Sequence, residues 1–146
     1  MILLIILDIG SKQIVFEYIS LHNFISVFPI LDLTHIHNYG ISFGLFSGII
    51  PSWIIICVGL IIISFIFYMM INVNSFAEKW GLMLIIAGAI SNIFDRTINN
   101  YVLDFIWLHY DEFYWPAFNL ADIYITIGVL IILYQAIRNY KNKITK

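Results

Sequence analysis

A run of nineteen residues from Trp53 to Ile71 contains no charged side chain. At 1.5 Å per helical residue the run spans about 29 Å, close to the thickness of the hydrocarbon core of a bilayer. This length and composition predict a transmembrane helix. The whole chain agrees, because 62% of its 146 residues are hydrophobic and only 11% are charged, which argues against a water-soluble domain.

Three further apolar segments predict three further spans, although Asp8, Lys12 and Glu17 interrupt the first. The first segment lacks the basic start and small-residue exit of a cleaved signal peptide, so we expect it to be retained. The sequence therefore predicts a single all-α polytopic membrane domain over residues 1–146. Its spans are expected at about 1–19, 53–71, 80–98 and 118–137, and its outer loops at about 20–52 and 99–117.

The basic residues indicate how the spans are oriented. Lys79 lies between the second and third spans, and four more follow the fourth span: Arg138, Lys141, Lys143 and Lys146. With four spans, all five lie on one side, which the positive-inside bias makes cytoplasmic. We therefore expect both termini in the cytoplasm and both long loops outside. The net charge of -2 and the lack of a basic stripe argue against a nucleic-acid partner.

The first outer loop is rich in β-branched and aromatic residues, which predicts short strands and turns at the bilayer surface. In a strand, His35 and His37 would point to one face, and His109 lies in the other outer loop. A metal site formed by these three histidines is therefore an alternative. However, HxH alone is a weak pattern, and neither an HExxH motif nor a Cys partner accompanies it. We predict no metal ligands.

Polar residues also lie in or at the ends of the predicted spans, where ionisable groups are costly unless they face one another. Three pairs each share a helix face by their spacing: Asp8 with Lys12, Asn92 with Arg96, and Asn119 with Asp122. In the predicted orientation all of them project toward the outer half of the bundle, beside Asp104. Any one pair could serve only as packing glue between helices. Packing alone does not require Asp104 and Asp122, two acids without cations of their own.

Two carboxyls at one water-accessible site suggest an aspartyl dyad. Like charges a few ångströms apart cannot both ionise easily, so one carboxyl keeps its proton while the other can take a proton from water. Such a pair titrates as a unit. The main alternative is a small proton- or ion-translocating membrane subunit, which would need polar groups along the whole depth of the bundle. A non-enzymatic scaffold is a further alternative.

Five motifs follow one another along the chain: DIGSK at 8–12, NYGISFGLF at 38–46, GAISNIFDR at 88–96, VLDFI at 102–106 and PAFNLAD at 116–122. In this order they resemble the pattern of lipoprotein signal peptidase, also called signal peptidase II, a bacterial inner-membrane aspartyl peptidase. The resemblance implies four transmembrane helices with a small extracytoplasmic β-cradle and a short loop helix around a lateral cleft.

The resemblance also implies an aspartic endopeptidase that removes the signal peptide from diacylglyceryl-modified prolipoproteins, cutting just before the lipidated Cys. Asp104 and Asp122 would be the catalytic pair, near the extracytoplasmic face of the membrane. The residues that would bind the substrate or support the pair are Asn38, Asn92, Arg96, Asn119, Asp8, Lys12 and Asp95. The expected partners are the lipid-modified prolipoprotein and membrane lipid, with no cofactor, and the chain is expected to be a monomer.

Two features depart from the family's pattern. Ser91 stands where the family usually has Gly, at a position where close helix packing favours a small side chain, and we expect Ser to be tolerated. Only seven residues precede Asp8, and they reach about 10 Å along a helix. We therefore expect either a start further upstream or an unusually short first span.

Overall fold

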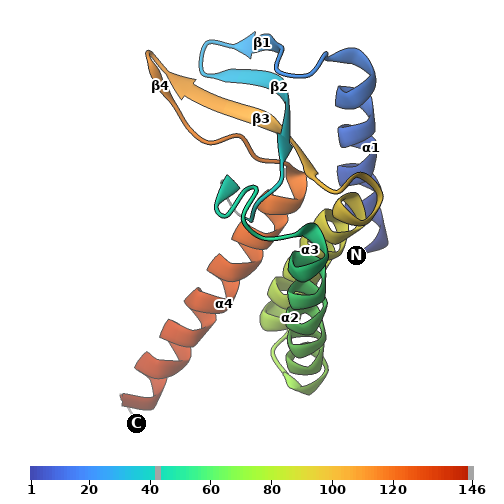
Figure 1. Ribbon diagram of the computed structural model, residues 1–146. Helices are drawn as coiled ribbons and strands as arrows, with labels where there is room; N and C mark the ends of the chain where they lie inside the picture. The colour runs from blue at the N-terminus through green and yellow to red at the C-terminus, as the bar shows by residue number, and fades with distance from the viewer. Residues whose placement is uncertain (42–43, 145–146) are drawn as a thin grey trace.

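The computed structural model describes residues 1–41 and 44–144. The described elements follow in the order α1 (Ile2–Tyr18), β1 (Phe24–Phe28), β2 (Leu31–Asn38), α2 (Ser52–Asn72), α3 (Phe76–Asn99), β3 (Val102–Tyr110), β4 (Phe113–Tyr114) and α4 (Leu120–Ile144). Figure 1 shows the strands gathered at one end of the molecule, with α1 beside them and the C-terminal end of α4 at the opposite end.

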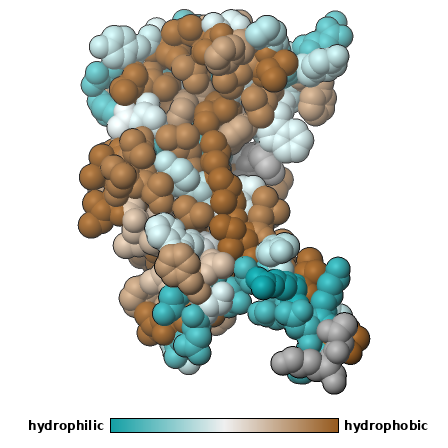
Figure 2. Space-filling model, turned by 180° about the vertical axis from the view of Figure 1, so that it is seen from behind, coloured by the Kyte–Doolittle hydropathy of each residue, from teal (hydrophilic) through white to brown (hydrophobic). Residues whose placement is uncertain are grey.

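Within the described residues, three helices are long and apolar enough to cross a membrane: α2, α3 and α4. α1 has 17 residues and a length of about 26 Å, so its role as a fourth span stays a prediction. α2 has no buried residue, and a helix that is apolar all round and not covered by protein is typical of a span surrounded by lipid. Figure 2 shows hydrophobic side chains over much of the helical body and hydrophilic ones beside the C-terminal residues.

A four-stranded antiparallel sheet agrees with the expected small sheet beside the helices, so the all-α class is only partly right. The strand order is β1-β2-β3-β4, and both predicted outer loops contribute two strands each. β3 is rich in residues such as Val102, Phe105 and Trp107, whose branched or aromatic side chains fit a pleated surface. The short loop helix stays a prediction, because residues 42–43, between β2 and α2, lie outside the described residues.

The hydrophobic core lies between α1 and the beginning of β3. Val15 and Ile19, at the end of α1, cluster with Leu103 and Phe105 of β3. Full burial of one such side chain contributes about 1.5–3 kcal/mol. This cluster therefore fixes α1 against the strand that carries Asp104.

α3 and α4 approach each other closely at small residues. A Cβ atom added to Gly88 of α3 would clash with the carbonyl oxygen of Ala121, and one added to Gly81 would lie 3.1 Å from the carbonyl oxygen of Gly128. Small residues at such positions allow helix backbones to pack tightly in a membrane. The contact at Gly88 fixes the N-terminal end of α4 against α3.

Two short connections bring β3 between α3 and α4. α3 ends at Asn99, and the next residue, Asn100, has a left-handed backbone (φ 65°) that turns the chain into β3. Before α4, the backbone N–H of Phe118 donates to the carbonyl oxygen of Ile106 at 3.0 Å, and the N–H of Ile106 donates back at 2.8 Å. This bridge holds the residue that follows, Asn119, beside β3.

Candidate active site

Asp104 and Asp122 line the same cavity, which has a volume of about 180 Å³. Asp104 lies in β3, where it pairs with Ile36 of β2, and Asp122 lies in the first turn of α4. The two predicted acids therefore reach one space from different elements. Three residues that the sequence predicted to bind the substrate or support the pair, Asn38, Asn92 and Arg96, also line this cavity.

Both carboxylate oxygens of Asp104 accept a hydrogen bond from a side-chain amide. Asn38 Nδ2 donates to Oδ2 at 2.9 Å, and Asn119 Nδ2 donates to Oδ1 at 2.7 Å. Asp104 is only 3% exposed. Burial raises the pKa of its carboxyl to about 7, the charge of Asp122 acts in the same direction, and the two amides oppose the shift. Near neutral pH this carboxyl can therefore hold or release a proton.

Asp122 is held by the start of its own helix. Asn119 Oδ1 accepts from the backbone N–H of Asp122 at 3.0 Å, and the backbone N–H of Asn119 donates to Asp122 Oδ2 at 3.2 Å. This reciprocal pair has the pattern of a capping box, which starts α4 and fixes both side chains. This capping box was not among the sequence-based predictions, although an Asn and an Asp three residues apart before an apolar run are a signal for it.

Asn92 of α3 holds the second oxygen of Asp122, since its Nδ2 donates to Oδ1 at 3.0 Å. An acid and a carboxylate at one cavity, each fixed by amide donors, can activate water and polarise a carbonyl group. The geometry therefore suits hydrolysis by general acid–base catalysis.

Arg96 closes another side of the cavity. Its guanidinium donates through Nη2 to the carbonyl oxygen of Gly40, and Asn38 Oδ1 accepts from the backbone N–H of Gly40 at 3.0 Å. These two contacts fix the turn that follows β2. Arg96 Nε is buried and has no hydrogen-bond partner among the described residues, which leaves one donor beside the cavity unused.

The other predicted site residues, Asp8, Lys12 and Asp95, are buried together where α1 meets α3. Lys12 Nζ lies 2.8 Å from Asp8 Oδ2 and 3.4 Å from Asp95 Oδ2. Ser91 Oγ donates to Asp8 Oδ2 at 2.6 Å, so the residue that departs from the family's pattern adds a hydrogen bond as well as being small. Lys12 also donates to Asn92, so this group is joined to the residues around the cavity.

The histidines of the outer loops do not all come together, as the metal-site alternative would require. His35 and His37 do point to one face, with their Nε2 atoms 3.0 Å apart, but His109 lies against Asp32 at 3.4 Å. Within residues 1–41 and 44–144, no group of three His, Cys, Asp or Glu side chains could hold a metal ion. The metal-site alternative therefore gains no support from these residues.

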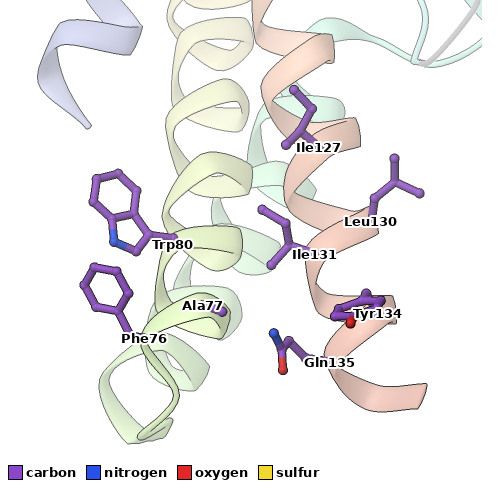
Figure 3. A pocket seen from close by; sticks show the side chains of 8 residues that line it. All are labelled: Phe76, Ala77, Trp80, Ile127, Leu130, Ile131, Tyr134 and Gln135. Atoms are coloured by element: carbon purple, nitrogen blue, oxygen red, sulfur yellow. The ribbon is translucent and has the colours of Figure 1, made fainter. Parts of the chain in front are cut away.

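Two larger hollows lie along α4. One, of about 530 Å³, is bounded by Asp122 and by mostly apolar residues such as Leu108, Trp115 and Ile127. The other, of about 520 Å³, lies between α3 and α4 and includes Phe76 and Trp80, as Figure 3 shows. None of its described lining residues is an Asp, Glu, His or Lys. The second hollow therefore offers no carboxyl or imidazole group among its described residues, and we assign the chemistry to the cavity between the two acids.

Comparisons with known proteins show the family and the fold of this chain. A family model described as signal peptidase (SPase) II matches residues 1–138. A lipoprotein signal peptidase of Thermodesulfovibrio yellowstonii is 35% identical over 137 residues, covering 93% of this chain and 90% of that protein. One of Bartonella quintana is 40% identical over 142 residues, covering 92% and 84%. A bacterial membrane enzyme solved by the in meso method at 2.3 Å resolution superposes with a TM-score of 0.90 at 28% identity, covering 97% of this chain and 87% of that one. The chain belongs to the signal peptidase II family.

Proposed function

We propose that this enzyme removes the signal peptide from prolipoproteins through an aspartyl pair formed by Asp104 and Asp122. Membership of the family supports the reaction, because its named members are lipoprotein signal peptidases. The observation that carries the residue assignment is the cavity that both acids line, with each carboxylate held by asparagine side chains.

In the proposed reaction the ionised carboxyl takes a proton from water, and the oxygen of this water attacks the carbonyl carbon of the scissile peptide bond. The protonated carboxyl donates to the carbonyl oxygen as negative charge develops there. When the tetrahedral intermediate collapses, the C–N bond breaks and a proton passes to the leaving amine. The two carboxyls share one proton, so the roles belong to the pair as a unit.

The remaining polar residues support this pair in two ways. Asn38 and Asn119 hold Asp104, and Asn92 holds Asp122, so neither carboxyl is free to rotate. We assign the unused Nε donor of Arg96 to a carbonyl oxygen of the substrate, because a buried donor gains most from a partner that arrives with the ligand.

The substrate in this proposal is a precursor whose Cys carries a diacylglyceryl group and is cut just before that Cys. The apolar hollow of about 530 Å³ that reaches Asp122 could take acyl chains or apolar signal residues beside the reacting bond. The proposed enzyme acts as a monomer.

The proposed orientation places the sheet and the cavity at the extracytoplasmic side of the bacterial inner membrane, and both termini in the cytoplasm. Lys141 and Lys143 lie in the last turn of α4, at the end opposite the sheet (Figure 1). The positive-inside bias supports a cytoplasmic position for that end.

The proton- or ion-translocating alternative is not favoured. Such a protein needs polar groups through the depth of its bundle. The segment of α4 from Ile127 to Leu133 has only Gly128 besides large apolar residues. The polar residues gather instead at the end of the bundle where the sheet lies.

The test is cleavage of a purified precursor by the purified enzyme in detergent micelles or liposomes. The same precursor is supplied with and without its diacylglyceryl group, and mass spectrometry locates the cut. We expect one cut, directly before the lipidated Cys, and little or no cleavage of the unmodified precursor. Cleavage at another bond, or equal cleavage of both precursors, would contradict the proposed specificity.

A further inference from the structure

Each of the two proposed catalytic acids follows a residue whose backbone is held by a buried carboxylate. The N–H of Ala121 donates to Asp8 Oδ1 at 2.8 Å, and the N–H of Leu103 donates to Asp95 Oδ2 at 2.9 Å. Asp8 thereby anchors the start of α4, and Asp95 anchors the start of β3. The two anchors come from α1 and α3, so they tie the reactive segments to separate helices.

Lys12 connects these two anchors. Its ammonium group lies 2.8 Å from the Asp8 carboxylate and 3.4 Å from the Asp95 carboxylate. All three residues are at least nine-tenths buried, and a buried carboxylate that loses its cation is strongly destabilised. One cation from α1 therefore holds together the two carboxylates that position β3 and α4.

Lys12 also determines which way the Asn92 amide faces. Its Nζ donates to Asn92 Oδ1 at 2.9 Å, which leaves Asn92 Nδ2 to donate to Asp122 Oδ1 at 3.0 Å. An ammonium group has donors only, so the amide oxygen must face Lys12. A flipped amide would place oxygen against oxygen at Asp122 and NH₂ against NH₃⁺ at Lys12.

We propose that Lys12 is a positioning residue that sets the geometry of the catalytic pair through its two carboxylate partners and Asn92. The inference rests on the proposed function of Asp104 and Asp122. Lys12 is not among the described residues that line their cavity, so it does not act on the substrate there; it acts through its partners and through its charge, which lowers the pKa of Asp104. Its removal should therefore slow the chemical step more than it weakens substrate binding.

The test is a double-mutant cycle of Lys12→Met and Asn92→Ala, measured as kcat and KM for the lipid-modified precursor. We expect each single variant to lower kcat about 100-fold with KM changed by no more than about twofold, the size of effect that a misplacement of about 1 Å produces. The double variant should be slowed by clearly less than the product of the two single losses, because the Lys12–Asn92 contact is lost in both single variants.

Gln13→Met is the matched control, because Gln13 is the exposed neighbour of Lys12 on α1 and donates to Glu17. It should retain wild-type kcat and KM. Losses that multiply to about 10⁴-fold in the double variant, or a rise in KM with kcat unchanged, would overturn the positioning role.

Folding of each variant is checked by size-exclusion chromatography and thermal unfolding in detergent. If Lys12→Met does not fold, the cycle is repeated with Lys12→Gln, whose neutral amide keeps donors near the two carboxylates, and the same non-additive result is expected. If neither variant folds while Asn92→Ala does, Lys12 serves folding and the inference is overturned. An inactive wild-type enzyme would instead count against the proposed function itself.

Discussion

Asn38→Ala should move the alkaline limb of the pH–rate profile to higher pH. Asn38 Nδ2 donates to Asp104 Oδ2 at 2.9 Å, a contact that favours the ionised carboxyl and lowers its pKa. The proposed pair needs one proton, so wild-type kcat/KM should fall as the pH rises through about 7 and Asp104 ionises. Removing the amide raises the pKa of Asp104, and the enzyme then keeps its proton to higher pH.

The size of the shift follows from this one contact. A hydrogen bond to a charged group contributes about 1.5–3 kcal/mol, and each pKa unit corresponds to about 1.4 kcal/mol. Loss of the whole contact would therefore raise the pKa of Asp104 by about one to two units. Asn119 still donates to the other oxygen of Asp104, and water can enter the space left by the amide. We therefore expect the pKa of Asp104 to rise by about one unit.

The assay is kcat/KM for precursor cleavage from pH 5 to pH 10, with wild type, Asn38→Ala and Asn72→Ala compared side by side. Asn72 donates to the carbonyl oxygen of Tyr68 in the last turn of α2, so its variant should follow the wild-type profile. An alkaline limb that stays in place in Asn38→Ala, or moves to lower pH, would refute the assignment of this limb to Asp104.

Two further predictions concern the packing around the site. Ser91→Ala should lower the free energy of unfolding by about 1–2 kcal/mol, measured by denaturant titration in micelles, because Asp8 loses a buried donor at 2.6 Å; unchanged stability would mean that this hydrogen bond contributes nothing. Gly88→Val should reduce both thermal stability and cleavage, since its side chain meets the Ala121 carbonyl. Gly10→Val adds a Cβ with nothing within 4 Å and should change neither thermal stability nor cleavage. Equal losses in the Gly88 and Gly10 variants would argue against a close α3–α4 contact.

The sequence predicted the spans that correspond to α2, α3 and α4, because a long apolar run is a local signal. Even so, the element ends differ from the predicted limits. α4 continues to Ile144, beyond the predicted end at residue 137, and α3 begins at Phe76, before the predicted start at residue 80. Helical hydrogen bonds continue into polar segments, whereas hydropathy marks only the part that lies in lipid.

The sheet was harder to predict because its pairing is not local. Strands and turns were expected in the first outer loop, but β3 is ordered by pairing with β2, about 70 residues earlier in the chain. The capping role of Asn119 and the donor role of Ser91 were also missed. The spacing of polar residues along a helix predicts the level of the bundle at which they lie, but not which of their atoms form hydrogen bonds.

The most direct test of the catalytic pair is single-turnover cleavage of the lipid-modified precursor by Asp104→Asn and Asp122→Asn. Asp32→Asn is the matched control, because Asp32 is as buried as Asp104 but lies against His109 in the sheet. We predict that each of the first two variants folds and cleaves about 10²- to 10⁴-fold more slowly than wild type, while Asp32→Asn remains active. Near wild-type cleavage by a folded Asp104→Asn or Asp122→Asn enzyme would contradict the account.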